Sequence, residues 1–238
     1  MIGFGHLLSL AAIAALLGGL SAVERKGAFQ LMLSRPLVLA TVMGWALGDV
    51  RGGLMLAVPL ELLFLGGVNL GGNLPDNESL LAAALTAMLV PAGLSAHTGV
   101  DPPLAALGLA LLFPLALFGR RLERAQEQRN LLLLAEAEGL AARGDPEPAR
   151  VNLRGLLLPF GASAGICALA VMVAPLLARA RMSADMPLVA SLEGAWHAVW
   201  AVAAACAIRA IRDPRAPAFA AVAAVAAMAV ALALRGVL

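Results

Sequence analysis

The sequence predicts an all-α, polytopic integral membrane protein. Of its 238 residues, 61% are hydrophobic and only 13% are charged, and the mean hydropathy is +0.89. Soluble domains carry roughly 45 to 50% apolar residues, so a water-soluble globule is excluded. The chain also holds 24 Gly and 14 Pro, and bilayers tolerate broken backbone only where protein or a water-filled cavity covers it. We therefore expect broken or re-entrant helices among the spans.

The first hydrophobic segment covers residues 2–22. Secretory signals carry positive charge before their apolar core, whereas Arg25 and Lys26 follow this one, so we expect a retained first helix. Further hydrophobic segments cover residues 36–48, 54–70, 79–96, 102–118, 155–178, 186–208 and 218–234. The sequence thus predicts about eight segments.

Several segments are shorter than the roughly 20 residues that a helix needs to cross a bilayer. The segment at 36–48 is the clearest, and we expect a half-helix or a re-entrant hairpin there. Gly44 and Gly48 are four residues apart, and Gly161 and Gly165 repeat this spacing. Small residues at this spacing favour close approach of two helices.

Three polar residues are interpreted as structural. Asp49 follows the second segment beside Arg51, which is typical of an interfacial helix cap. Glu193 and His197 lie four residues apart, on one face of a predicted helix, so we expect a satisfied Glu–His pair.

The distribution of basic residues predicts the membrane orientation. If eight segments alternate across the bilayer with the N-terminus outside, 13 of the 17 basic residues lie on the inner side. Arg51, Arg179, Arg181 and Arg235 remain outside. Cytoplasmic loops carry the excess of Lys and Arg, so this orientation is favoured. Replacing one short pair of segments by a re-entrant hairpin leaves the orientation unchanged.

A polar stretch at 120–154 divides the chain into an N-terminal membrane half (1–119), a connector (120–154) and a C-terminal membrane half (155–238). The connector is rich in helix formers up to Gly144 and turns at residues 145–148. Its leucines at 131–134, next to charged residues, indicate a helix on the cytoplasmic membrane surface or docked on a partner. A solvated connector that only fixes topology is an equal alternative.

Glu61 is the most informative residue, because it lies within a long apolar run. A carboxylate in a bilayer costs about 2.5 to 3.5 kcal/mol unless it faces a polar interior. The next residues, 66–79, hold four glycines, Asn69, Asn73 and Asp76, and should break the helix. Transporters bind polar solutes at such breaks, and a neutral sugar needs donors and acceptors of this kind. The alternative is a structural Glu61 that pairs with an arginine such as Arg35.

The two cysteines and the motif content exclude other classes of site. Cys167 and Cys206 lie inside apolar runs without CxxC spacing, so neither a disulfide framework nor a metal cluster is expected. A Gly-rich phosphate loop, an HExxH motif and a catalytic triad are absent from the sequence. We expect no catalytic residue, no metal, no cofactor and no nucleic-acid partner.

Residues 30–89 resemble the membrane IIC subunit of bacterial sugar phosphotransferase systems of the mannose/fructose/sorbose family. The landmarks are the Gln-x-x-x-Ser-Arg-Pro sequence that starts at Gln30, the Gly-x-x-x-Gly-Asp at 44–49, Glu61 with Gly66, and the Asn/Gly-rich break before Pro75 and Asp76.

The resemblance implies a permease subunit with two inverted halves in the bacterial inner membrane. It implies a second membrane subunit, IID, and soluble IIA and IIB, which relay phosphate from phosphoenolpyruvate through HPr; the phosphoryl donor is a histidine on IIB. This chain would bind and move sugar without carrying phosphate. The implied substrate-binding residues are Glu61, Asn69, Asn73, Gln30 and Asp76. We also expect an oligomer. The competing hypothesis is a non-transporting scaffold or regulatory subunit.

Overall fold

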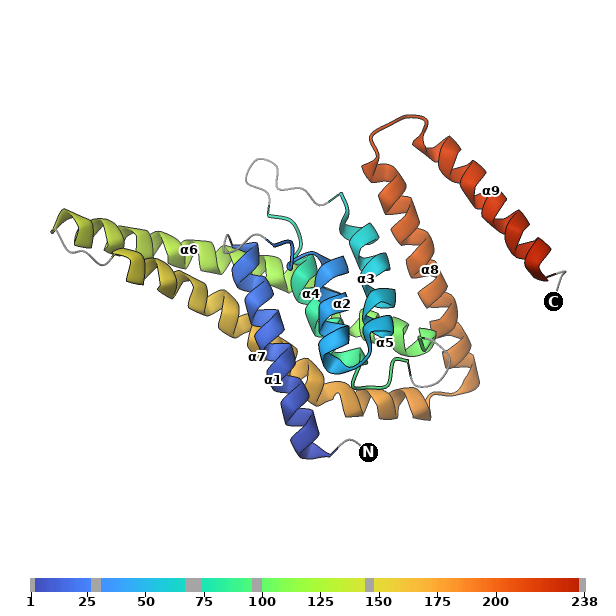
Figure 1. The fold of residues 1–238 in the computed structure, drawn as a ribbon, viewed down its shortest axis with the longest axis horizontal. Coiled ribbons are helices and arrows are strands. Elements are labelled where there is room, and N and C mark those ends of the chain that lie inside the picture. The colour runs from blue at the N-terminus through green and yellow to red at the C-terminus, as the bar shows by residue number, and fades with distance from the viewer. Residues whose placement is uncertain (1–2, 27–30, 67–73, 96–99, 144–147, 236–238) are drawn as a thin grey trace.

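The computed structural model describes residues 3–26, 31–66, 74–95, 100–143 and 148–235, and the regular structure among them is entirely helical (Figure 1). The helices are α1 (Phe4–Arg25), α2 (Pro36–Leu47), α3 (Val50–Phe64), α4 (Glu78–Leu89), α5 (Pro102–Leu112), α6 (Pro114–Ala142), α7 (Pro148–Ser183), α8 (Met186–Ala210) and α9 (Ala216–Arg235). Each predicted hydrophobic segment overlaps a helix, and the segment at 102–118 covers α5 and the start of α6. The remainder of α6 forms most of the connector.

Four helices are long and apolar enough to cross a bilayer: Phe4–Arg25, Pro102–Ala142, Leu153–Ser183 and Met186–Ala210. The second of these joins α5 to α6 through a break at Phe113, directly before Pro114. Proline cannot donate its backbone nitrogen to the helix ladder, which explains the break at this point. The predicted all-helical membrane fold is confirmed.

Helices α2 and α3 form a tight hairpin. Proline at position 36 suits the first turn of α2, and Gly48 ends the helix in the left-handed conformation with φ +94°. The Asp49 side chain then accepts a hydrogen bond from the Gly52 N–H at 2.8 Å, which confirms its predicted role as a cap. Gly44 lies against Gly53, and a Cβ on Gly44 would lie 2.7 Å from the Gly53 Cα.

Helices α4 and α5 form a second hairpin. The side chains of Asn77 and Asp101 cap the two helices by accepting hydrogen bonds from Leu80 N at 2.8 Å and Leu104 N at 3.0 Å. Helix α4 is the centre of the molecule, because every residue from Ser79 to Leu89 is buried.

Both hairpins begin at the end of the molecule where α1 finishes. The basic residues at this end are Arg25, Lys26, Arg35, Arg120, Arg209 and Arg212, and it is termed the basic end. At 1.5 Å per residue, α2 and α3 extend roughly 18 and 22 Å, against about 33 Å for α1. The first hairpin is therefore shorter than α1. Residues 36–47 thus form the predicted short helix, and its re-entrant course in the bilayer stays a prediction.

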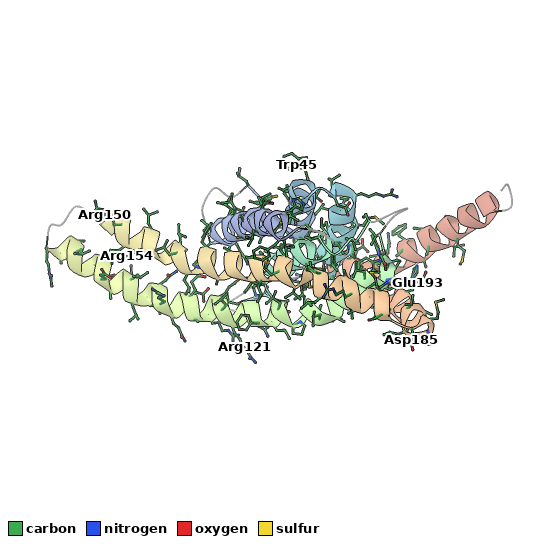
Figure 2. The ribbon with its side chains drawn as sticks, turned by 90° about the horizontal axis from the view of Figure 1, so that it is seen from below. Trp45, Arg121, Arg150, Arg154, Asp185 and Glu193 are labelled. Carbon is green, nitrogen blue, oxygen red and sulfur yellow. The ribbon has the colours of Figure 1, made fainter. Side chains whose placement is uncertain are left out.

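Helix α6 and the first part of α7 run side by side as an arm that projects from the other helices (Figures 1 and 2). Arg150 and Arg154 lie near the tip of the arm (Figure 2), where Arg154 pairs with Glu136 at 2.9 Å. Helix α7 then packs against α1. The divisions proposed at 119/120 and 154/155 fall inside α6 and α7.

The predicted close packing at Gly161 and Gly165 is wrong. A Cβ at either position would have open space around it. The close contact of α7 with α1 lies instead at Gly18 and Gly19, which face Cys167 and Phe160. The glycines of α1 provide the room, and the larger side chains come from α7.

Candidate functional site

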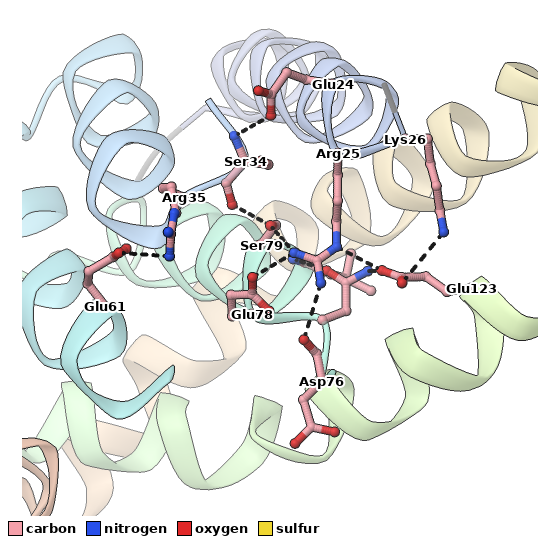
Figure 3. Close-up of polar contacts among 12 residues, drawn as sticks. Glu24, Arg25, Lys26, Ser34, Arg35, Glu61, Asp76, Glu78, Ser79 and Glu123 are labelled. Atoms are coloured by element: carbon pink, nitrogen blue, oxygen red, sulfur yellow. Dashed lines mark hydrogen bonds and ion pairs between the residues drawn. The ribbon is translucent and has the colours of Figure 1, made fainter. Parts of the chain in front are cut away.

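Glu61 lies in the last turn of α3, at the basic end. Its carboxylate accepts a hydrogen bond from the Leu37 N–H at 3.2 Å and lies 3.4 Å from the Arg35 guanidinium (Figure 3). The first N–H groups of a helix have no partner within the helix, so Glu61 satisfies one of them at the start of α2. The structure thus contains the Arg35 contact that the structural alternative for Glu61 expects.

The contact between Glu61 and Arg35 is weak and open to water. The side chain of Arg35 is 52% exposed, and that of Glu61 is 18% exposed. Exposed ion pairs contribute about 0 to 1 kcal/mol. An ionised carboxylate also has about four acceptor positions, and its contacts with the described residues use two. A polar ligand could therefore share this carboxylate or replace Arg35 at little cost.

Asp76 lies immediately before α4 and faces two ways. Its backbone carbonyl accepts a hydrogen bond from Arg25 Nη2 at 3.4 Å, whereas its carboxylate points away from Arg25 (Figure 3) and lies 3.5 Å from Arg120 Nη1. The Asp76 Oδ1 atom is buried without a hydrogen-bond partner in the described part of the chain. Glu61 and Asp76 therefore lie at the same end of the molecule, in contact with different arginines.

The other predicted substrate-binding residues, Gln30, Asn69 and Asn73, lie outside the described residues. Gly66 and Leu74, the described residues on either side of 67–73, both line a cavity at the basic end.

This cavity has a volume of about 730 Å³. It is open on one side and is lined by the end of α3, the residues before α4, the start of α6, the end of α8 and the residues just after it. Its lining residues are Leu63, Phe64, Leu65, Gly66, Leu74, Pro75, Asp76, Glu78, Arg120, Cys206, Arg209, Ala210 and Arg212.

A buried ionic cluster around Arg25 was not predicted. The Arg25 guanidinium contacts Glu78 at 2.6 Å, Glu123 at 3.0 Å and the Ser79 hydroxyl at 3.2 Å (Figure 3). The Asn77 amide donates to Glu123 at 2.7 Å. We refer to Arg25, Asn77, Glu78, Ser79 and Glu123 as the Arg25 cluster. It joins the end of α1 to the start of α4 and to α6.

Two contacts extend the Arg25 cluster. Lys26 lies 3.6 Å from Glu123, and the Ser79 hydroxyl donates to the Ser34 carbonyl. The Ser34 N–H in turn donates to the buried Glu24 carboxylate at 2.8 Å. The turn before α2 is therefore fastened to α1 and α4, which fixes the position from which the first hairpin starts.

The sequence offers a weak signal for the Arg25 cluster. Glu78 directly precedes the apolar segment at 79–96, and Glu123 follows the segment at 102–118 after a short stretch that contains two arginines, so each could have been placed near a membrane boundary. Their common partner, Arg25, could not have been identified from the sequence, because it is 53 and 98 residues away from them.

The predicted pair of Glu193 and His197 differs from the observed contact. His197 Nδ1 lies 2.8 Å from the backbone carbonyl of Glu193. The one-turn spacing is correct, but the observed partner is the backbone carbonyl of Glu193 and not its carboxylate.

A family model described as the sorbose-specific IIC component of the phosphotransferase system matches residues 7–237. The match covers both membrane halves and the arm.

Individual relatives match over a shorter region. The sorbose-specific EIIC component of Klebsiella pneumoniae is 38% identical over 86 residues, and the mannose-specific EIIC component of Escherichia coli (strain K12) is 34% identical over 86 residues. The fructose permease IIC component of Bacillus subtilis (strain 168) is 35% identical over 79 residues. These alignments cover 32 to 36% of this chain, and the chain spans 29% of the length of each relative.

Two solved structures share the fold. A structure described as a membrane protein covers 99% of this chain and 93% of its own, with a TM-score of 0.67 and 23% identity. The cryo-electron microscopy structure of the mannose transporter ManYZ with microcin E492 covers 99% and 92%, with a TM-score of 0.55 and 23% identity. Together with the family match over residues 7–237, these findings show that the chain belongs to the family of sorbose-specific IIC components of the phosphotransferase system.

Proposed function

We propose that this chain is a IIC permease subunit of a mannose/sorbose-type phosphotransferase system, which binds a sugar and carries it across the membrane. One observation carries the proposal: Glu61 lies at the open end of the α2–α3 hairpin, where its carboxylate has unused acceptor positions and its arginine partner is exposed and weakly held. Family membership supports the same function.

In the proposed site, Glu61 accepts hydrogen bonds from sugar hydroxyls. The amides of Asn69, Asn73 and Gln30 supply donors as well as acceptors, and Asp76 supplies a further carboxylate. Arg35 neutralises Glu61 while the site is empty and yields to the ligand. A neutral sugar suits such a site, because it brings no net charge that would need a counter-ion.

The proposed orientation places the basic end in the cytoplasm and the N-terminus outside. The basic end brings together Arg25, Arg35, Arg120, Arg209 and Arg212, whereas Arg181 lies at the opposite end, where it pairs with Asp101 at 3.1 Å. This asymmetry follows the positive-inside rule for a multi-pass protein of the bacterial inner membrane.

In this proposal the chain itself performs no phosphoryl transfer. The soluble IIB subunit, supplied by IIA and indirectly by HPr, phosphorylates the sugar at the basic end, and a IID subunit completes the sugar path. A transporter named ManYZ shares the fold of this chain, which favours a partnered membrane assembly. The arm offers the soluble subunits a projecting surface.

Substitution of Glu61 tests the proposal. In vesicles that contain the partner subunits, Glu61→Ala should reduce sugar-dependent phosphorylation and sugar binding by about tenfold or more, because hydrogen bonds to a charged group contribute roughly 1.5 to 3 kcal/mol. Glu61→Gln should retain part of the binding. Glu193→Gln is the matched control, because Glu193 is an exposed glutamate on another membrane helix. Full sugar-dependent phosphorylation by a normally inserted Glu61→Ala variant would contradict the assigned site.

A second candidate function is a non-transporting scaffold that recruits partners through the arm. It is favoured by the arm's exposed leucines, since Leu131 and Leu132 are 67% and 74% exposed. A scaffold would show no saturable sugar binding in the purified membrane complex, so one binding isotherm separates the two functions.

A further inference from the structure

We propose that the cavity at the basic end binds a phosphate group, with Arg209 and Arg212 as its principal ligands. The cavity measures about 730 Å³ and brings Arg209, in the last turn of α8, and Arg212, just after α8, together with Arg120. Planar guanidinium groups bind phosphate oxygens through paired hydrogen bonds, and arginine is the preferred residue for this contact.

The charges in the cavity leave two arginines available. Arg120 faces the Asp76 carboxylate at 3.5 Å, and the Glu78 carboxylate is held by Arg25 at 2.6 Å. Arg209 and Arg212 make no ion pair and no side-chain hydrogen bond with any residue that the structure describes. The lining therefore carries two uncompensated positive charges. A phosphate monoester carries about −1.5 to −2 at pH 7 and matches this surplus.

Arg209 and Arg212 are both exposed, and one wall of the cavity beside them is apolar. Leu63, Phe64 and Leu65 contribute an apolar side, and charges interact more strongly next to apolar walls than in open water. An uncharged ligand would leave both arginines uncompensated. The geometry thus favours an anionic ligand with a compact, multivalent head.

Two molecules at this end of a membrane protein carry such a head: a phosphorylated sugar and an anionic phospholipid. The cavity borders Gly66 and Leu74, on either side of the predicted amide-rich sugar site, and basic pockets between membrane helices also bind lipid head groups. The choice of a sugar phosphate as ligand rests on the proposed function, whereas the phosphate site itself does not.

Cys206 provides a built-in probe, because it lines the cavity and is partly exposed. The full-length chain, with Cys167 replaced by Ala, is reconstituted in phosphatidylcholine nanodiscs, and the rate of Cys206 labelling by an uncharged maleimide is measured. Inorganic phosphate and a hexose 6-phosphate are the probes, and the free hexose is the control ligand. A parallel sample contains phosphatidylglycerol. The phosphate-bearing molecules should slow the labelling.

The variants Arg209→Gln and Arg212→Gln should raise the ligand concentration needed for protection by about tenfold or more. Arg209→Lys should give an intermediate value, because the charge remains but the paired geometry is lost. Arg215→Gln is the matched control: Arg215 is a nearby exposed arginine that does not line the cavity, and its loss should leave protection unchanged.

Each outcome has a defined meaning. Protection by hexose 6-phosphate in phosphatidylcholine supports the sugar-phosphate source, and protection only in phosphatidylglycerol supports the lipid source. Absence of protection by any phosphate-bearing molecule, or equal protection in the double variant Arg209→Gln/Arg212→Gln, would overturn the site. Binding of the free hexose is measured in the same nanodiscs with Glu61→Ala. If the Glu61→Ala variant binds the free hexose as well as the unchanged protein does, the sugar site is refuted and the phosphate site is not.

Discussion

At the scale of single residues, the basic end contains two kinds of ionic contact. The Arg25 cluster is largely buried: Glu123 within it is only 5% exposed, and the side chains of Arg25 and Glu78 are 15% and 16% exposed. The Arg35–Glu61 contact is exposed and long. Burial makes the first kind costly to disrupt, because removing one partner leaves a charge without compensation in a poorly solvated place. The second kind can open and close, which is what a ligand-binding carboxylate requires.

Removing Arg25 should therefore destabilise the protein. In Arg25→Gln the carboxylates of Glu78 and Glu123 lose their guanidinium partner, and the expected loss of stability is about 3 kcal/mol. Thermal unfolding in detergent, followed by size-exclusion chromatography, would show a lower midpoint. The control is Arg154→Gln, which breaks the exposed pair with Glu136 and should cost less than about 1 kcal/mol. Equal midpoints for the two variants would contradict the structural role of Arg25.

At the scale of elements, the hairpin of α2 and α3 depends on backbone contact. Gly44 and Gly53 meet so closely that a Cβ on Gly53 would lie 2.9 Å from the Gly44 Cα and would also meet the Ala40 carbonyl. Without a hydrophobic force between helices in lipid, such close approach of small residues provides the packing energy. The hairpin also carries Glu61 and fixes its distance from Arg35.

Gly53→Ala should separate α2 from α3 and impair sugar binding together with stability. The added methyl group has backbone atoms as neighbours, so it cannot be accommodated by a rotamer change. Gly161→Ala is the matched control, because that position has open space and alanine favours helix over glycine by about 1 kcal/mol. Calorimetric sugar binding and thermal midpoints would check both effects. A Gly53→Ala protein that keeps normal values for both would rule out this account of the hairpin.

At the scale of the whole molecule, the two hairpins enter from the basic end, and the long helices surround them. Helix α1 packs on α7, and α8 packs on α3 and α5. Helix α9 contacts mainly α8 and lies apart from the other helices in Figure 1. Because the basic residues collect where the hairpins begin, the orientation of the molecule also decides from which side the hairpins enter.

Cysteine accessibility tests this orientation. In a background without Cys167 and Cys206, Gly139→Cys on the arm should react with an impermeant thiol reagent only after the cells are opened. Met182→Cys at the opposite end should react in intact cells. Both positions are exposed, so a difference between them reports sidedness. Labelling of Gly139→Cys in intact cells would reverse the topology.

The sequence predicted elements better than contacts. Apolar runs located the helices, and local chemistry located the Asp49 cap, because both signals lie within a few adjacent residues. The continuation of the helix past residue 118 into the arm was visible as a run of helix formers. By contrast, the contacts of Arg25 with Glu78 and Glu123 depend on tertiary packing across 53 and 98 residues, and no local pattern encodes them. Glu61 was identified by its position as a carboxylate in an apolar run. Its contact with Arg35 was one of two alternatives that the sequence left open, the other being a carboxylate that faces a ligand.

The short reach of the first hairpin has a consequence for the surrounding lipid. Its tip carries Asp49 and Arg51, yet α2 spans only about 18 Å, compared with roughly 33 Å for α1. In a bilayer thick enough for α1, we therefore expect water and head groups to dip toward that charged tip and the membrane to thin locally. Acyl-chain length should therefore affect this protein most strongly beside the hairpin tip, with shorter chains relieving the mismatch.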